Sequence, residues 1–443
     1  MSTIKISNAN IVNEGQIFQA DVWIEGGFIK EIGKIAKQAD ENIDATGKYL
    51  LPGLIDDQVH FREPGLTHKG TIYTESKAAV AGGITSYMEM PNTNPAAVTQ
   101  ELLEEKYEIA SKSSLANYSF FMGTTNHNME ELLKTNPKNV CGIKIFMGSS
   151  TGDMLVDNET MLNEIFSKVK MLIAIHAEED PIVRANTEKF KAEYGDKLDA
   201  TYHHLIRSEE ACYASSSKAV ALAKKHGTRL HILHISTAKE LDLFTNTIPL
   251  KEKKITAEAC VHHLWFSNED YKTKGNYIKW NPAVKTVSDR EAIWKAVLDG
   301  RIDVIATDHA PHTIEEKEKA YIDAPSGGPL VQHSLVALLE KYHEGKISIE
   351  NIVEKACHNV AILFQIEKRG FIREGYYADM VLVDINSPWT VEKSNIISKC
   401  NWSPFEGYTF KSQVTDTFVS GHWAYHSGAF NEEQKGARLT FER

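Results

Sequence analysis

Six short apolar runs of the sequence each lead into a residue that can bind a metal, carry a charge or orient a substrate. These residues are His60, Asn92, Lys144, His176, His234 and Asp308. Imidazole and carboxylate groups are preferred ligands of zinc, so the three histidines and the aspartate predict a metal site. A protonated lysine cannot coordinate a cation. Lys144 is therefore either a partner for substrate charge or a modified ligand.

The densest cluster of such residues is the segment DDQVHFREPG, from Asp56 to Gly65. In a regular strand, side chains alternate between two faces, which places Asp56, Gln58 and His60 on one face and Asp57 on the other. Two histidines at this spacing would grip one metal ion. Because Gln58 stands in the first place, the spacing alone is a weak signal.

Eight β-prone runs with helical patterns between them provide the frame for these residues. The runs are Gly53 to Phe61, Ile84 to Asn92, Asn117 to Gly123, Gly142 to Gly148, Met171 to Glu178, Arg229 to Ser236, Ile255 to His263 and Asp303 to His312. Helices are expected at Gln100–Ser111 and Arg207–Lys225, whereas Asp180–Ile206 gives no readable pattern. Eight β-α units predict an α/β fold with a closed (β/α)8 barrel over residues 51–365, whose strand ends gather the six residues at one mouth.

The two ends of the chain show a different, strand-rich pattern. Alternating runs occur at Thr3–Ile6, Asp21–Ile24 and Phe28–Ile32, near Phe371, and at Ala378–Asp384 and Val414–Val419. Such alternation between turn signals is typical of short antiparallel strands. We expect residues 1–50 and 366–443 to form one small β-sandwich-like domain.

Charge and composition narrow the class of protein. The 49 basic and 60 acidic residues give a net charge of -11, which disfavours binding to nucleic acids and anionic membranes. No apolar stretch reaches the 18 or more residues of a membrane span, and the N-terminus lacks a secretory pattern. The five cysteines are scattered without paired spacing, which favours a reducing cytoplasmic location.

Seven motifs, in order between about Leu51 and His312, together resemble dihydroorotases of the amidohydrolase superfamily. They are PGLIDDQVHFREPG, PNTNP, GIKIFMGSSTG, IHAEE, HILHIST, WNPAVK and ATDHAPH. The later EGYYADMVLVD is similar to the closing strands of the same family. The resemblance implies reversible, zinc-dependent cyclisation of N-carbamoyl-L-aspartate to L-dihydroorotate, a step of pyrimidine synthesis.

The resemblance also implies a role for each matching residue. His60 would bind the first zinc ion, His176 and His234 the second, and Asp308 would be both a ligand and the catalytic acid/base. Lys144, carboxylated by carbon dioxide, would bridge the two metals. In some relatives an aspartate forms the bridge, and Asp153 or Asp157 is the alternative here. The substrate carboxylate would contact Arg62, Asn92 and His312, and the ring amide would contact Asn281. A loop at residues 324–329 would close over the substrate.

Gln58 is the one clear departure from the family pattern. An amide oxygen is a poorer zinc ligand than imidazole, and an average ligand of a structural zinc site contributes about 3 kcal/mol. We expect tight zinc binding at Lys144, His176 and His234 and a weakened first site. The substitution keeps an inactive assembly partner, for example of aspartate transcarbamoylase, as an alternative. A hydantoinase or allantoinase is the other alternative, and a homodimer is expected.

The remaining histidines are expected to have packing, hydrogen-bonding or surface roles. They are His127, His203, His204, His231, His262, His263, His309 and His358.

Overall fold

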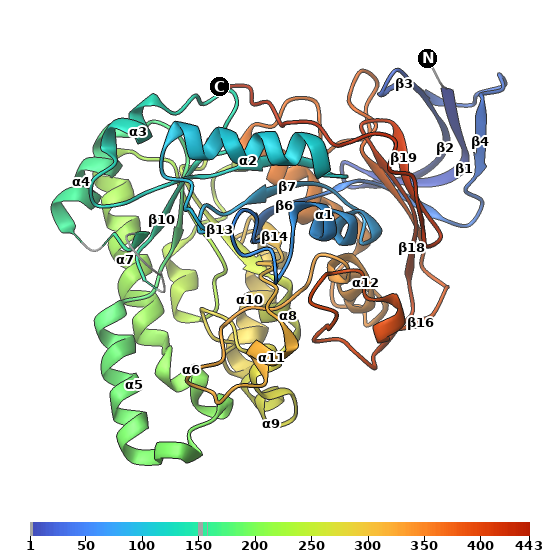
Figure 1. Ribbon diagram of the computed structural model, residues 1–443. Helices are drawn as coiled ribbons and strands as arrows, with labels where there is room; N and C mark the ends of the chain where they lie inside the picture. Colours follow the sequence, from blue (N-terminus) through green and yellow to red (C-terminus); the bar gives the residue numbers. More distant parts are fainter. Residues whose placement is uncertain (1–2, 149–153, 157) are drawn as a thin grey trace.

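Parallel strands at the centre of the molecule, in one sheet of six and one sheet of three, close into a ring (Figure 1). The computed structural model describes residues 3–148, 154–156 and 158–443. The ring strands are β6 (Leu54–Val59), β7 (Ile84–Glu89), β8 (Asn117–Phe120) continued by β9 (Met122–Gly123), β10 (Ile143–Phe146), β11 (Ile173–His176), β12 (Leu230–Ile232), β13 (Ile255–Cys260) and β14 (Val304–Ala306). The His60 N–H donates to the His309 carbonyl at 2.7 Å, which joins the first and last strand positions. The predicted (β/α)8 barrel is confirmed.

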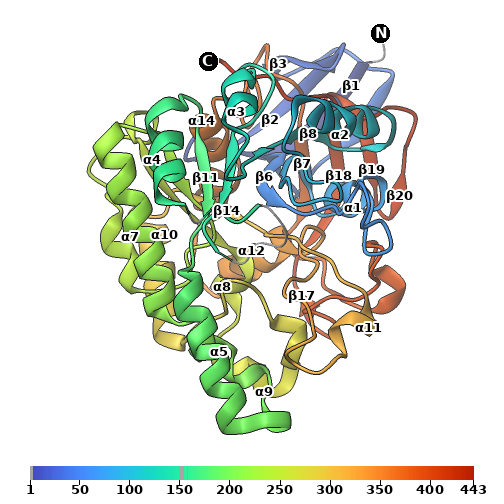
Figure 2. The same ribbon diagram turned by 60° about the vertical axis from the view of Figure 1, so that its left-hand side comes forward.

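Fourteen α-helices occur in the described part of the chain, and several of them wrap the outside of the ring (Figure 2). They are α1 (Ile72–Ala81), α2 (Gln100–Ser113), α3 (Met129–Lys134), α4 (Glu159–Lys168), α5 (Asp180–Tyr194), α6 (His203–Ile206), α7 (Glu209–His226), α8 (Val261–Trp265), α9 (Tyr271–Lys274), α10 (Val287–Asp299), α11 (Ile314–Lys317), α12 (Ser334–His343), α13 (Ile349–Val353) and α14 (Asn359–Phe364). Side-chain caps mark helix starts, as where Thr99 accepts from the Leu102 N–H. The expected helices α2 and α7 are present, and α5 and α6 occupy the stretch that gave no readable pattern.

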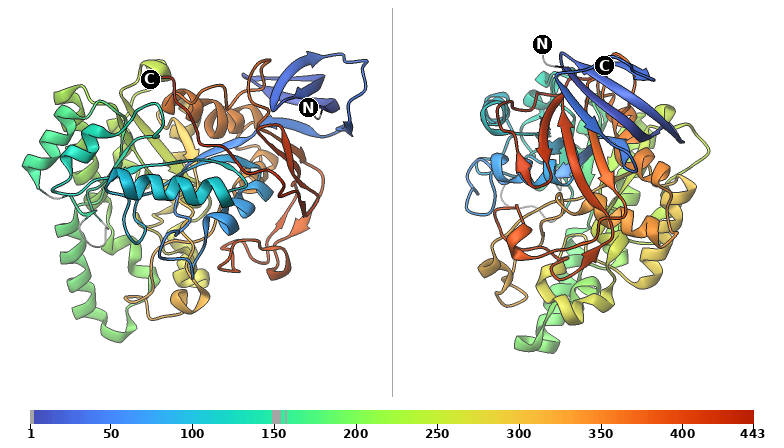
Figure 3. Two further views of the ribbon diagram at one scale, coloured as in Figure 1. Left: turned by 45° about the horizontal axis from the view of Figure 1, so that its top comes forward. Right: turned by 90° about the vertical axis from the view of Figure 1, so that its right-hand side faces the viewer.

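The two chain ends pair in a separate mixed sheet beside the barrel (Figure 3). Its strands are β1 (Thr3–Asn13), β2 (Gln16–Glu25), β3 (Phe28–Gly33), β4 (Glu41–Asp44), β5 (Tyr49–Pro52), β15 (Met380–Asp384), β18 (Gln413–Val419), β19 (His422–His426) and β20 (Ala429–Phe430). β5 pairs with β15, so the ends meet as predicted, in one continuous sheet of nine strands. Phe371, near which a strand is predicted, lies outside any strand, and its ring stacks on His358 with the ring centroids 4.3 Å apart.

The C-terminal segment also reaches the barrel. A two-stranded sheet of β16 (Trp389–Thr390) and β17 (Thr409–Phe410) precedes the last strands. Between them, the Trp402 indole N–H donates to the His312 carbonyl at 2.7 Å, which fixes the rim of the barrel. The exact domain boundaries at 50/51 and 365/366 stay a prediction. In the described residues, no helix has the length and apolar character needed to cross a membrane.

Candidate active site

One cavity of about 390 Å³ at the C-terminal ends of the barrel strands contains every predicted site residue. Its lining includes Gln58 and the nine predicted residues His60, Arg62, Asn92, Lys144, His176, His234, Asn281, Asp308 and His312. The structure therefore brings the whole set together, although their chemical roles stay predictions. A larger cavity of about 740 Å³, beside Arg229 and Lys254, contains none of them.

The expected alternation along the first barrel strand is wrong. Between Asp56 and Val59, β6 has one more residue than its partner β7, so the pairing register shifts there. Such a bulge changes the direction in which the neighbouring side chains point. Asp57 contacts His231 across the barrel, at 3.1 Å from carboxylate to Nε2, while Gln58 also lies inside, 3.6 Å from the Cys260 sulfur. Asp57 and Gln58 therefore both face the barrel interior.

His60 is held in one orientation by two neighbours. Its Nδ1 lies 2.8 Å from the Asn92 amide oxygen, which requires a proton on Nδ1. Nε2 lies 3.2 Å from Asp308 Oδ1. Burial and the charge of Arg62 hold the pKa of His60 well below its usual value, so the ring is neutral. A neutral ring with a fixed Nδ1–H presents Nε2 as a ligand atom.

His176 and His234 form a second pair of ligand atoms. His176 Nε2 lies 2.8 Å from Glu178, and His176 Nδ1 lies 2.9 Å from His234 Nε2. The Arg207 guanidinium donates to the same Glu178 carboxylate, at 2.5 Å. Glu178 thus orients His176 in the way that outer carboxylates orient metal-bound histidines. The His234 Nδ1 atom is buried without a hydrogen-bond partner among the described residues.

Lys144 lies in the same cavity with its amine unused. Only 1% of the residue is exposed, and Nζ has no hydrogen-bond partner in the described structure. Burial lowers the pKa of Lys144 to about 7, despite the charges of Asp308 and Glu258. An unpartnered buried amine beside His176 and His234 fits a metal-bridging carbamate. The donor set of imidazoles, a carboxylate and a modifiable lysine therefore fits a zinc centre.

Three cavity residues adopt the left-handed backbone conformation. Arg62, His234 and Asp308 have φ angles of 74°, 40° and 51°. Such conformations cost about 1–3 kcal/mol for residues other than glycine and cluster at functional sites. Burial also raises the pKa of Asp308 to about 7, against the opposing charges of His176, Lys144 and Arg62. A carboxyl group with this pKa can both accept and donate a proton near neutral pH.

A cationic subsite lies at one side of the cavity. The Arg62 Nε–H donates to the Pro311 carbonyl at 3.0 Å, and Nη2 lies 3.0 Å from His312 Nε2. Among the described residues, Arg62 forms no ion pair within 4.0 Å, so its charge is available to a ligand. Asn281 Oδ1 is also buried without a described partner. The arrangement suits a small anion with a neighbouring amide.

The loop at residues 324–329 closes this side of the cavity. The Lys317 ammonium donates to the carbonyls of Pro325 and Gly327, each at 2.8 Å. Gly327 has a φ of 126°, and a Cβ there would lie 2.6 Å from the Ala310 carbonyl oxygen. His312 Nε2 lies 3.0 Å from the Ser326 carbonyl. The loop is therefore tied to the predicted anion subsite.

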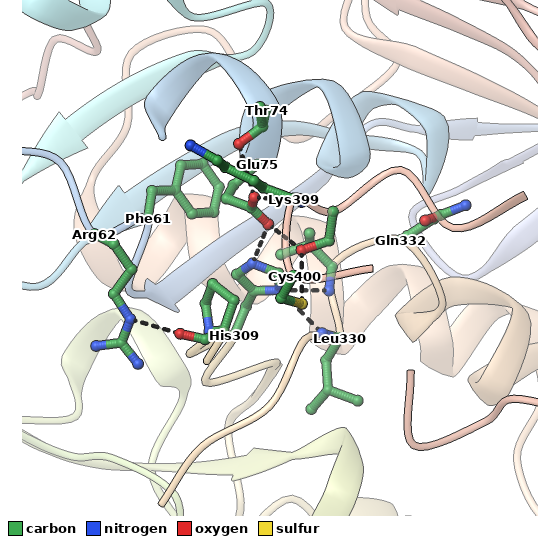
Figure 4. Close-up of polar contacts among 12 residues, drawn as sticks. Phe61, Arg62, Thr74, Glu75, His309, Leu330, Gln332, Lys399 and Cys400 are labelled. Carbon is green, nitrogen blue, oxygen red and sulfur yellow. Dashed lines mark hydrogen bonds and ion pairs between the residues drawn. The ribbon is translucent and has the colours of Figure 1, made fainter. Parts of the chain in front are cut away.

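A polar network beside Asp308 was not predicted (Figure 4). The His309 Nδ1 atom accepts from the Leu330 N–H at 2.9 Å, so Nε2 carries the proton donated to Glu75, at 2.8 Å. Glu75 also accepts from the Lys399 N–H at 3.0 Å. Burial alone would raise the pKa of Glu75, but His309 and its other donors lower it. The network anchors the residue after Asp308 to α1 and to the C-terminal segment.

The sequence held only faint signals for these supporting residues. Glu178 follows His176 by two positions, and His309 follows Asp308 directly, but their partners lie far along the chain. Asp153 and Asp157, the alternative bridging residues, lie outside the described residues.

Comparison with known proteins assigns the chain to a family. A model described as "Amidohydrolase family" matches residues 49–424. A dihydroorotase of Halobacterium salinarum is 34% identical over 88% of this chain and 89% of its own length, and one of Methanosphaera stadtmanae is 32% identical over 95% and 96%. The solved L-hydantoinase (dihydropyrimidinase) of Arthrobacter aurescens is 26% identical, covers 100% of both chains and has a TM-score of 0.93. Because the family model matches most of the chain and relatives match along nearly its whole length, this chain belongs to the amidohydrolase family, and the two curated relatives named above are dihydroorotases.

Proposed function

We propose that the protein is a dihydroorotase, which interconverts N-carbamoyl-L-aspartate and L-dihydroorotate in pyrimidine synthesis. The observation that carries the proposal is the pairing, in one cavity, of a cationic subsite at Arg62 and His312 with the ligand set around Lys144. Both compounds have an α-carboxylate that takes no part in the reaction and is free to be bound. A planar guanidinium matches such a carboxylate in a two-point contact.

Zinc is the metal that this donor set favours. His176, His234 and carboxylated Lys144 would hold one ion, and His60 with the same carbamate and Asp308 would hold the other. When bound, zinc supplies Lewis acidity that polarises the ring carbonyl and makes water a better nucleophile at neutral pH. Asn92 and Glu178 support this arrangement because they fix the orientation of His60 and His176.

The protein groups then divide the remaining work. Arg62, Asn92 and His312 hold the substrate carboxylate, and Asn281 receives the ring amide. In ring opening, the Asp308 carboxylate takes the proton of the attacking water and delivers it to the departing amide nitrogen. In ring closure the two transfers run in reverse. The loop tied to Lys317 keeps bulk water from the subsite.

A direct assay tests the proposal. Purified protein supplied with zinc and bicarbonate should convert dihydroorotate and carbamoyl aspartate into each other, and should turn over hydantoin and allantoin far more slowly. The hydantoinase alternative is kept in the assay because solved hydantoinases share the fold. Turnover of hydantoin alone would replace the dihydroorotase assignment with the hydantoinase alternative. No turnover of any compound would favour the inactive assembly partner.

Arg62→Lys should weaken dihydroorotate binding by about 10- to 100-fold, because a point charge replaces a two-point contact to a carboxylate. Dihydrouracil, the same ring without the carboxylate, is the control ligand, and its weak binding should not change. Inhibition constants of both ligands measure the difference. Equal losses for the two ligands would show that Arg62 supports the cavity without contacting the carboxylate.

Gln58 should leave the zinc position near His60 less occupied than the position at His176 and His234. The Gln58 amide oxygen is the side-chain atom that could bind zinc. It already accepts a weak hydrogen bond from the Cys260 thiol, at 3.6 Å, which supports weak participation in metal binding. Gln58→His should raise affinity at the first position by about 100-fold. Anomalous diffraction at the zinc edge, compared between the two proteins, gives the occupancy of each position. Equal, full occupancy in the unaltered protein would contradict the prediction.

A cytoplasmic location and a homodimer belong to the same proposal. All five cysteines are buried and unpaired, which supports a reducing compartment. An association with aspartate transcarbamoylase stays a prediction, for which co-sedimentation of the two purified proteins is the measurement.

A further inference from the structure

Three ionisable side chains meet in the barrel interior outside the cavity described above. We call Asp57, His231 and Glu258, from β6, β12 and β13, the core triad. All three are 0% exposed, and none lines the 390 Å³ cavity. His231 Nε2 lies 3.1 Å from Asp57 Oδ2 and 3.7 Å from Glu258 Oε2. One ligand atom from each of the three residues lies within 4.8 Å of the other two, and ligand atoms around a tetrahedral zinc ion lie about 3.3 Å apart, so the spacing suits one shared ion.

The hydrogen bonds around His231 point its free nitrogen into the triad. The Thr256 hydroxyl donates to the Leu230 carbonyl at 3.2 Å, so its oxygen accepts from His231 Nδ1, at 2.9 Å. With the Nδ1 proton engaged in this way, Nε2 is the atom that faces the two carboxylates. Metal-binding histidines use the same pattern, in which one ring nitrogen donates outward and the other holds the ion.

Each of the two carboxylates also has one oxygen that no hydrogen bond uses. Glu258 Oε1 accepts from the His234 N–H at 2.9 Å and lies 3.3 Å from the Cys260 sulfur. Glu258 Oε2 and Asp57 Oδ1 are buried and have no hydrogen-bond partner among the residues that the structure describes. Two buried carboxylates are costly unless a positive charge compensates both. A divalent cation with a neutral imidazole balances the two negative charges completely.

We propose that the core triad binds a divalent transition-metal cation, with zinc favoured by the mixed nitrogen and oxygen ligands. Asp57 and Gln58 both lie within the bulge of β6, and the bulge turns Asp57 toward His231. The ion fixes Glu258, which in turn holds the backbone N–H of His234. It thus has a structural role beneath the predicted catalytic metals and is separate from them.

A proton is the competing occupant of the triad. Burial alone would lower the pKa of His231, but the hydrogen bonds and charges of Asp57 and Glu258 raise it to about 9. An imidazolium ion between the carboxylates would compensate one negative charge instead of two. Metal analysis separates the two occupants because only one of them adds a metal equivalent.

The test compares unaltered protein with Asp57→Asn and with the control Asp56→Asn. Asp56 is a neighbouring buried carboxylate whose oxygens bind Thr307 and lie outside the triad. After equilibration with zinc and gel filtration, mass spectrometry of the metal should find about one equivalent fewer in Asp57→Asn, whose triad affinity falls about 100-fold or more. Asp56→Asn should keep the full count. Circular dichroism checks that each variant is folded.

Crystals of the unaltered protein provide an independent measurement. Anomalous diffraction at the zinc edge should give a peak bounded by Asp57, His231 and Glu258, apart from any peak at His176 and His234. The absence of that peak after zinc soaking, or an unchanged metal count in folded Asp57→Asn, would assign the triad to a proton. If Asp57→Asn does not fold, the anomalous peak alone decides. Dihydroorotase activity is not a readout, so the proposed function stands or falls separately.

Discussion

Asp308→Asn should lower kcat by at least about 1000-fold in both reaction directions. A general acid/base contributes about 10²- to 10⁴-fold, and a neutral amide cannot accept the proton that the carboxylate carries. The substitution also weakens a metal ligand beside His60, whose Nε2 lies 3.2 Å from Asp308 Oδ1. The fold should survive because asparagine tolerates the left-handed conformation, here a φ of 51°, about as well as aspartate. Steady-state kinetics with each substrate measure the loss.

A control at the opposite end of the same strand separates catalysis from stability. Asp303 precedes β14, is buried and forms an ion pair with Lys253, with 2.6 Å between charged atoms. Asp303→Asn leaves a buried lysine without its partner and should cost about 3–5 kcal/mol of unfolding free energy, while kcat of the folded protein stays near the unaltered value. A kcat within tenfold of normal in Asp308→Asn would remove Asp308 from the proton-transfer role.

The barrel could be predicted from the sequence because each of its strands is buried on both faces. Such strands are continuous apolar runs, and the polar residues that follow them stand out at their ends. His176 and Lys144 could thus be placed at one mouth without any structure. The helix α5 could not be placed in this way, because its residues from Asp180 to Tyr194 are largely polar and exposed, with Val183 as its one buried residue.

Contacts between distant segments were beyond the sequence. The bulge of β6 appears only when its residues are counted against those of β7, so the pattern of strict alternation misassigned Asp57. Glu75 and His309 are separated by 234 positions, and nothing local in either segment indicates their hydrogen bond. The core triad depends both on the register of β6 and on contacts between distant strands. Residue types fix what a site can do, but long-range pairing decides which of them meet.

Lys144→Gln should abolish carbamate formation, remove tightly bound zinc from the cavity and lower kcat by at least about 1000-fold. Carboxylation joins the lysine nitrogen to carbon dioxide and releases one proton, which requires a neutral amine. Lys144 meets this requirement because burial lowers its pKa to about 7 and no described group forms a hydrogen bond with Nζ. Protein equilibrated with ¹³C-bicarbonate should show a carbamate carbon resonance that Lys144→Gln lacks.

Lys106 is the matched control for this experiment. It is another fully buried lysine, but its ammonium lies 2.9 Å from the Glu89 carboxylate and donates to the Met90 carbonyl at 3.0 Å. An ammonium paired in this way has no free electron pair for carbon dioxide, so Lys106→Gln should lower stability and keep the carbamate resonance. Loss of the resonance in Lys106→Gln, or full zinc content and activity in Lys144→Gln, would show that Lys144 is not the bridging ligand.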